Sequence, residues 1–185
     1  WKERDAKMNE IQDATPMKTG LFFTSKFLAV MLALAMVQIM LIVLGVISQL
    51  VHGFTHFKFE FYFGYLFAFE LFRFSFWVVL ALFMHHVINN RYIAYFAFIT
   101  FLILNLFIWD ILKVSTKLVK YGSVGNFQLS DMNGFGPFGE SIKWFSLYWA
   151  SGAVLLLLVA YAYMLRGKET TWKARSKNAW FRLNN

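Results

Sequence analysis

Four long apolar runs dominate the sequence and limit what the chain can fold into. They lie near residues 27–51, 66–88, 92–112 and 144–165. Each is close to the length of roughly 20 residues that a helix needs to cross the hydrocarbon core of a bilayer. The runs are apolar on all sides, which is typical of membrane spans or of the centre of a large core. We therefore predict an all-α membrane protein, a bundle of about four transmembrane helices within residues 27–165.

The composition supports a membrane environment. The 185-residue chain is 59% hydrophobic and only 15% charged, and its mean hydropathy is +0.52. A soluble domain of this size would expose a large share of its residues to water, so it could not hide this much apolar surface. The chain has no cysteine, which excludes disulfides, thiolate metal ligands and a cysteine nucleophile.

The positive charge lies beside the apolar runs. Residues 1–26, Arg91 and residues 166–185 together carry twelve Lys and Arg, whereas Lys58 and residues 113–143 carry five. Because short cytoplasmic segments are enriched in Lys and Arg, we expect both ends of the chain in the cytoplasm and residues 121–140 outside. A nucleic-acid-binding protein would instead carry a basic stripe on a soluble surface, so we expect no nucleic-acid partner.

The connections between the runs differ in character. Asn89-Asn90-Arg91 predicts a tight helical hairpin. Residues 52–63 alternate Phe with polar residues, which is compatible with a strand or with an irregular, aromatic-rich turn at the membrane surface. Residues 121–140 are rich in glycine and predict a structured external loop that can dip back into the outer leaflet.

Three side chains have the spacing of a helical metal site. His52, His56 and Glu60 stand four residues apart, and two histidines with a glutamate form a zinc ligand set. Gly53 and the alternating Phe residues argue against a helix in this stretch. We therefore interpret the three residues as a polar cluster at the membrane surface and predict no metal site.

The apolar runs contain a few charged residues. Glu70 and Arg73 are spaced to pair on one helix face near the outer end of the second run. Asp110 and Lys113 have the same spacing at the outer end of the third run. A charge in lipid costs several kcal/mol unless it is paired or reaches the interface. Each pair is therefore a neutralised interfacial pair, or it lines a path or meets another chain.

Motifs of enzymatic catalysis are absent from the sequence. There is no H-E-x-x-H, no Walker A loop and no G-x-S-x-G. Residues 130–134 resemble the start of a calcium loop, but the later ligand positions of such a loop hold Phe135 and Ile142. We therefore predict that this chain is not an enzyme and that it holds no cofactor of its own.

Two groups of residues resemble a known transporter family. The first group resembles the cytoplasmic coupling helix of type-2 ATP-binding-cassette exporter permeases and comprises Glu3-Arg4-Asp5, Glu10-Ile11, Asp13-Ala14-Thr15-Pro16 and Lys26. The second group resembles the membrane part of Bacteroidetes-type permeases that are fused to a zinc aminopeptidase. It comprises Tyr65, Asn89-Asn90-Arg91-Tyr92, residues 130–136, Leu147-Tyr148-Trp149 and Arg166-Gly167.

The resemblance implies roles for individual residues. The residues implied to couple the permease to its ATPase are Arg4, Asp5, Glu10, Asp13, Thr15 and Pro16. Those implied in an external re-entrant loop are Asp131, Asn133 and Gly134. ATP would bind to a separate ATPase subunit, and a second permease half or other membrane subunits would complete the transporter in the bacterial inner membrane.

The chain departs from this family in two ways. It lacks counterparts of the first two spans, so the resemblance implies an incomplete permease half. It also lacks the peptidase domain with its zinc motif. An alternative function is therefore a non-transporting membrane anchor or scaffold subunit, either of an envelope complex or of a fused peptidase. Residues 166–185 form a basic, aromatic tail, which we expect on the cytoplasmic side.

Overall fold

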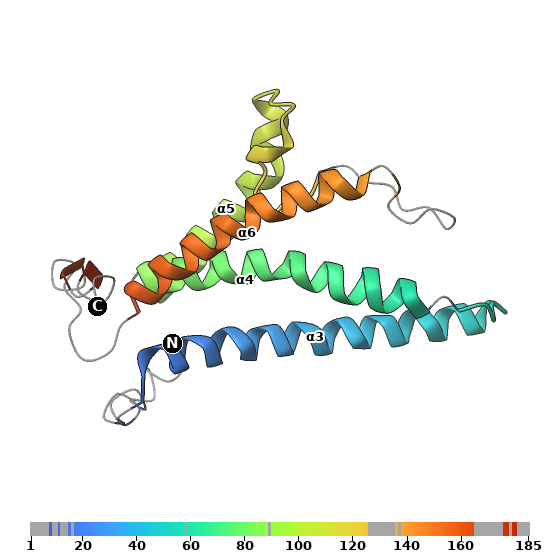
Figure 1. The fold of residues 1–185 in the computed structure, drawn as a ribbon, viewed down its shortest axis with the longest axis horizontal. Helices are drawn as coiled ribbons and strands as arrows, with labels where there is room; N and C mark the ends of the chain where they lie inside the picture. Colours follow the sequence, from blue (N-terminus) through green and yellow to red (C-terminus); the bar gives the residue numbers. More distant parts are fainter. Residues whose placement is uncertain are drawn as a thin grey trace. The chain divides into compact units, whose positions relative to one another are not determined.

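A computed structural model describes most of the chain, and its described residues are 8, 11, 15, 17–57, 59–88, 90–125, 136, 138–164, 176, 177, 179 and 180. Within them the protein is helical and contains no strand, which confirms the predicted all-α class (Figure 1). In chain order the elements are α3 (Thr19–Val51), the π-helix η1 (Phe61–Phe69), α4 (Glu70–Val87), α5 (Arg91–Ile111), the short 3₁₀ helix η2 (Lys117–Val119) and α6 (Phe138–Ala162).

Four of the described helical segments are long and apolar enough to cross a membrane. They are Thr19–Val51, Phe61–Val87, Arg91–Ile111 and Phe138–Ala162. The shortest has 21 residues and so extends about 31 Å, which matches the hydrocarbon thickness of a bilayer. The predicted count of about four transmembrane helices is confirmed, and the chain is a multi-pass membrane protein.

The chain forms two compact units, and α4 runs from one into the other. One unit is Lys18–Val78, and the other combines Trp1–Met17 with Val79–Asn185. In the first unit η1 runs back beside the end of α3, where the Tyr62 hydroxyl donates a hydrogen bond to Gln49 Oε1 at 2.5 Å (Figure 1). In the second unit small side chains are fully buried on two helices, Ala94 on α5 and Ala160 on α6. Small residues let helix backbones approach closely in membranes.

Helix α3 is longer than the apolar run that predicts it. It begins at Thr19, eight residues before the expected start at residue 27. Two polar side chains in this extra length bond within the helix: the Thr24 hydroxyl donates to Gly20 O and the Ser25 hydroxyl donates to Phe22 O, both at 2.9 Å. The helix ends where Gly53 adopts φ 79° and its N–H donates to Leu50 O at 3.0 Å. The Phe54 N–H donates to Gln49 O at 3.0 Å, which completes a Schellman cap.

For residues 52–63 the sequence was compatible with a strand or with an irregular turn. The strand is wrong, and the irregular turn is found in only part of the segment. Residues 54–57 have no regular structure, but the chain is helical again from Phe59. In η1 the rings of Phe61, Tyr65 and Phe69 form a column with successive centroids 5.4 and 5.6 Å apart. These rings are four residues apart along the chain. Because four is a multiple of two, the same residues also fit the two-residue repeat of a strand. The alternating pattern therefore did not distinguish a strand from the wide turns of a π-helix.

The predicted tight hairpin between the second and third spans is confirmed. Helix α4 ends at Val87 and α5 begins at Arg91. The Asn90 side chain caps α5, because its Oδ1 accepts hydrogen bonds from Tyr92 N at 2.9 Å and Ile93 N at 3.4 Å. An asparagine in this position satisfies backbone N–H groups that have no partner inside the helix.

Replacing Asn90 with alanine should lower the free energy of unfolding by about 1 kcal/mol, because the cap is lost. Unfolding in mixed detergent micelles, followed by circular dichroism, measures the change. Asn90→Asp is the matched control, since its carboxylate still accepts both N–H groups and should keep most of the stability. An alanine variant as stable as the wild type would show that the cap contributes nothing.

Helix α6 begins at Phe138, six residues before the expected start at residue 144. The predicted external loop of residues 121–140 therefore ends earlier than expected. Glu140 lies in the first turn of the helix, where a negative charge interacts favourably with the helix dipole. Tyr163 and Met164, which belong to the fourth run, follow the end of the helix at Ala162.

Candidate functional site

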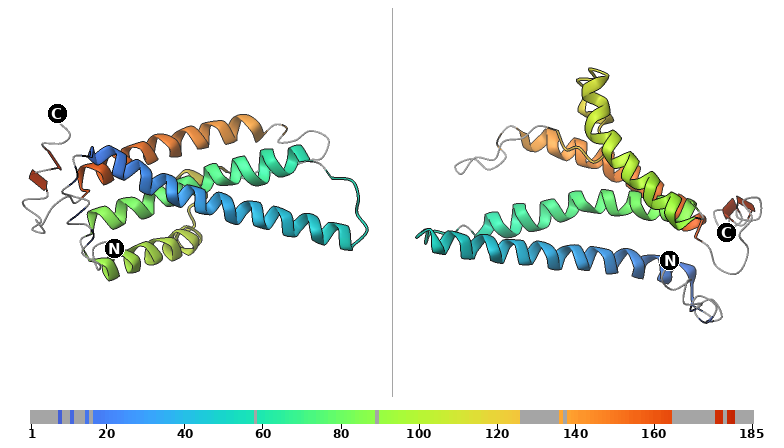
Figure 2. Two further views of the ribbon diagram at one scale, coloured as in Figure 1. Left: turned by 90° about the horizontal axis from the view of Figure 1, so that it is seen from below. Right: turned by 180° about the vertical axis from the view of Figure 1, so that it is seen from behind.

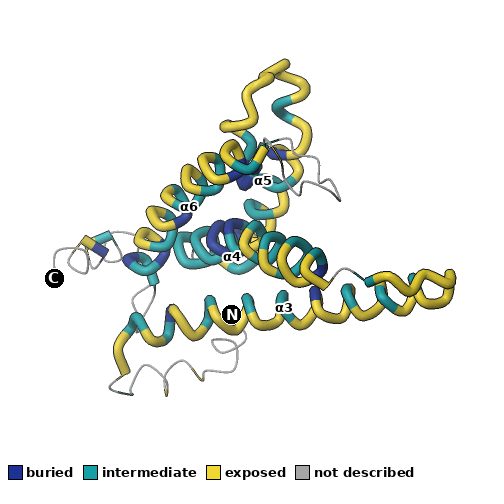
Figure 3. The backbone as a smooth tube through the Cα atoms, turned by 45° about the vertical axis from the view of Figure 1, so that its right-hand side comes forward, coloured by how far each residue is buried: buried dark blue, intermediate teal, exposed yellow. Residues whose placement is uncertain are grey.

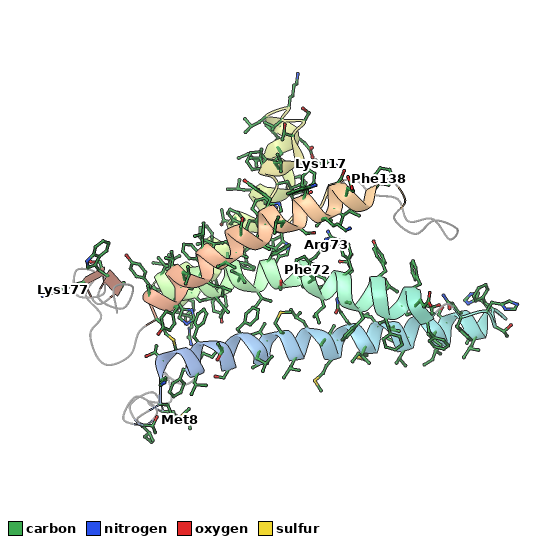
Figure 4. All side chains as sticks on the ribbon, in the orientation of Figure 1. Met8, Phe72, Arg73, Lys117, Phe138 and Lys177 are labelled. Atoms are coloured by element: carbon green, nitrogen blue, oxygen red, sulfur yellow. The ribbon has the colours of Figure 1, made fainter. Side chains whose placement is uncertain are left out.

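The sequence-predicted pair of Glu70 and Arg73 is formed. Arg73 Nη1 donates to Glu70 Oε1 at 2.7 Å, and the side chains are 23% and 33% exposed for Glu70 and Arg73 respectively. The predicted position near the outer end of the span is wrong: the span begins at Phe61 rather than at residue 66, so Arg73 projects from the middle of the span formed by η1 and α4 (Figure 4). The Arg73 Nε atom is buried and has no hydrogen-bond partner among the described residues. The ion pair neutralises two charges that would each be costly in lipid.

The pair lies directly after an unusual piece of helix. The π-helix η1 ends at Phe69, and Glu70 is the next residue. Tyr65 of η1 lies close enough to Glu70 and Arg73 to interact with both electrostatically. We name Tyr65, Glu70 and Arg73 the intramembrane polar cluster. Since π-helical turns occur frequently at functional sites and charged groups inside a span mark ligand or ion pathways, this cluster is the candidate site of the first unit.

The other predicted ion pair is wrong. Asp110 is exposed in the last turn of α5, and among the described residues it forms no ion pair with Lys113. Lys113 adopts φ 53°, and its backbone N–H donates to Asp110 O at 3.2 Å. The Val114 N–H donates to Trp109 O at 3.0 Å, so Lys113 lies in a Schellman cap rather than in the helix. The spacing rule for helical pairs fails because the helix stops before Lys113.

A second polar site, which the sequence analysis missed, holds the connection between α5 and α6. Asn105 is 4% exposed on α5. Its Oδ1 accepts hydrogen bonds from Tyr121 N at 2.9 Å and from Trp109 Nε1 at 3.2 Å, and its Nδ2 donates to Tyr121 O at 3.4 Å. Asn105 is a lone amide within an apolar run, and such a residue in a span is itself a signal of a specific partner.

The chain that follows α5 therefore turns back and runs beside that helix as far as Tyr121, as Figures 1 and 2 show. Asn105 lies six residues before the end of α5, so Tyr121 reaches about 9 Å back along that helix. The Tyr121 ring packs edge-on against Phe101 and Trp149, with centroids 5.8 and 4.8 Å away. Burial raises the pKa of Tyr121 above its ordinary value.

The described part of this return ends at two residues with close neighbours, Val124 and Gly125. Val124 is buried, and Gly125 adopts φ 84° beside the ring of Phe145. Residues 121–125 therefore fold back against α5 and α6, while the predicted dip of the whole loop into the outer leaflet stays a prediction. The loop residues implied by the family resemblance, Asp131, Asn133 and Gly134, lie outside the described residues.

The expected coupling residues are almost entirely outside the described part of the chain. Arg4, Asp5, Glu10, Asp13 and Pro16 are not among the described residues, and Thr15 lies half-buried in a bend. Met8 and Ile11, which are described, are helical and exposed. In the tail, Ser176, Lys177, Ala179 and Trp180 are helical, and the remaining residues of 166–185 are outside the description.

Of the two histidines before η1, His52 contacts the backbone, and His56 packs edge-on against the Phe54 ring. His52 Nδ1 lies 2.7 Å from Ser48 O in the turn that ends α3. Among the described residues no group of three His, Asp or Glu side chains is arranged to hold a metal ion.

Together, the fold and these sites define a multi-pass helical membrane protein with paired charges inside one span and a loop that folds back on another. Comparisons with protein-family models, with curated proteins and with solved structures found no match to this chain.

Proposed function

We propose that the chain is the permease segment of an ATP-binding-cassette type exporter. The observation that carries the proposal is the intramembrane polar cluster: an ion pair, part-exposed, inside an otherwise apolar span and directly after a π-helix. Charged groups in spans are costly, and where they occur they commonly mark substrate or ion pathways. The resemblance of residues 3–16 to an exporter coupling helix supports the same function.

In this proposal the chain performs no chemistry itself. A separate ATPase subunit in the cytoplasm binds and hydrolyses ATP, and residues 2–13 transmit its movement to α3. A second permease half, or other membrane subunits, completes the translocation path in the bacterial inner membrane. The Glu70–Arg73 pair would line that path, where its charges can meet a polar group of the substrate.

Charge reversal in the coupling segment tests this function. The double substitution Arg4→Glu and Asp5→Lys should leave the spans inserted, because neither residue contributes to them. It should lower the vanadate-sensitive ATPase activity that co-purifies with the protein about tenfold or more, since a reversed charge pair at a contact costs over 1.4 kcal/mol. The assay uses full-length protein, purified from its native membrane in mild detergent.

The tail offers a matched control. Lys168→Glu with Glu169→Lys also reverses two adjacent charges without changing the net charge, and it should leave the co-purifying ATPase activity unaltered. If no ATPase co-purifies with the wild-type protein, or if both reversals have equal effects, the exporter proposal fails.

A second candidate function is a non-transporting anchor or scaffold subunit of an envelope complex. The observation in its favour is the exposure of α3, on which only Phe23 and Gln38 are buried among 33 residues (Figure 3). Such a surface can be covered by lipid or by the helices of other membrane subunits. Co-purification of other membrane subunits without an ATPase would favour this function over the exporter.

A further inference from the structure

We propose that the connection between α5 and α6 carries a binding surface for the headgroup of an anionic phospholipid. The surface consists of Lys113, Lys117 and Lys120, with the aliphatic side chains of Leu118 and Val119 beside them. The inference is independent of the exporter proposal, because it concerns the membrane itself and a different unit from the intramembrane polar cluster.

The position of the surface follows from its two ends. At one end α5 stops at Ile111, and the Schellman cap at Lys113 turns the chain. At the other end Asn105 holds both the N–H and the C=O of Tyr121, about 9 Å back along α5. The residues between these two points must therefore lie near the boundary between the hydrocarbon core and water. The η2 helix, marked by Lys117 in Figure 4, lies in this segment.

The chemistry of this segment suits a lipid headgroup. Residues 111–125 contain three lysines and no acidic residue. Lys113 and Lys117 are exposed, and Lys120 is half-exposed. Each basic residue near an anionic lipid surface contributes about 1 kcal/mol to binding. A phosphodiester headgroup is the anion that is always present at this depth, so we infer an anionic phospholipid as the partner.

The apolar neighbours distinguish a lipid from a free anion. Leu112, Val114, Leu118 and Val119 are exposed large hydrophobic residues among the lysines. In water this arrangement would leave four aliphatic side chains without cover, whereas at a bilayer surface they meet acyl chains while the lysines reach the phosphates. A lipid therefore fits the whole surface: its headgroup can bind the lysines, and its acyl chain can contact the aliphatic side chains.

A local fluorescence measurement tests the proposal. The chain has no cysteine, so Ser115→Cys, between Lys113 and Lys117, accepts a single bimane label. The labelled full-length protein is reconstituted in phosphatidylcholine vesicles that contain a small fraction of doxyl-labelled lipid. The doxyl group sits near the headgroup end of the acyl chain, and the labelled lipid is either phosphatidylglycerol or phosphatidylcholine. The ratio of quenching by the two lipids reports which headgroup is preferred at this surface.

We expect labelled phosphatidylglycerol to be preferred at least about fivefold at low salt, which is the factor that about 1 kcal/mol from a single lysine gives. The triple substitution of Lys113, Lys117 and Lys120 by glutamine should bring the ratio close to one, while replacement of all three by arginine should keep it. The preference should also weaken at about 1 M salt, where the Debye length falls to about 3 Å.

A charge-matched control separates this surface from general attraction. Lys18, Lys26 and Lys168 lie in segments expected on the opposite side of the bilayer, so replacing them with glutamine removes the same total charge and should leave the ratio unchanged. A wild-type ratio near one would overturn the proposal. So would a ratio that falls equally in both triple-glutamine variants, or competition by inorganic phosphate strong enough to abolish the preference.

Discussion

Replacing Asn105 with leucine is expected to lower the free energy of unfolding by about 2–4 kcal/mol and to free the connection between α5 and α6. Leucine has a similar size but cannot accept the N–H groups of Tyr121 and Trp109 or donate to Tyr121 O. Each buried polar group left without a partner costs about 1–3 kcal/mol. Titration with a denaturing detergent in mixed micelles, followed by tryptophan fluorescence, measures the stability.

The neighbouring residue on α5 provides the control. Leu104→Ala removes an exposed aliphatic side chain of the same helix and should change the stability much less. Release of the loop has its own readout: a cysteine at Ser123 should react with a methanethiosulfonate reagent faster in the Asn105→Leu background than in the wild-type background. If the two backgrounds react at the same rate and Asn105→Leu is as stable as Leu104→Ala, the hydrogen bonds of Asn105 do not hold the connection.

The second large effect concerns the ion pair in the span of η1 and α4. Arg73→Met should lower the stability by about 2–3 kcal/mol, because it leaves the Glu70 carboxylate without its partner in an apolar span. The double variant Glu70→Gln with Arg73→Met should be more stable than Arg73→Met alone, since it removes both charges together. The same detergent titration measures all variants.

This prediction depends on non-additivity, which a simple loss of packing would not produce. Two residues that act independently give effects that add, whereas a broken ion pair makes the second substitution restore stability. Glu70→Gln alone also leaves one charge unpaired inside the span, so the double variant should be more stable than this single variant as well. A double variant whose loss equals the sum of the single losses would show that the pair does not matter to folding.

The four spans could be predicted from the sequence because they depend on the average polarity of some 20 residues, a property that local detail hardly changes. The ends of the helices depend on single residues and were less predictable. Gly53 and Lys113 both stop a helix through the same cap, yet only glycine is a recognisable signal for the required backbone angle. The early start of α6 at Phe138 was hidden because Gly139 and Glu140 read as loop residues.

Among the candidate sites, the Glu70–Arg73 pair was predictable because both partners are three residues apart on one helix. The link between Asn105 and Tyr121 joins residues 16 apart, and nothing in the local pattern specifies a contact at that distance. The π-helix was equally hidden, since its aromatic residues are compatible with several backbone periods. The features of the candidate sites that could not be predicted from the sequence are thus a tertiary contact and an unusual helical turn.

At Lys113 the backbone conformation and the charge of the side chain favour different residues. A side chain with φ 53° is strained, whereas glycine adopts this angle freely, at a difference of about 1 kcal/mol. An engineer seeking a more robust protein would therefore choose Lys113→Gly. The same change removes one of three positive charges near the bilayer surface. A gain in thermal stability would therefore be accompanied by a lower affinity for anionic lipid.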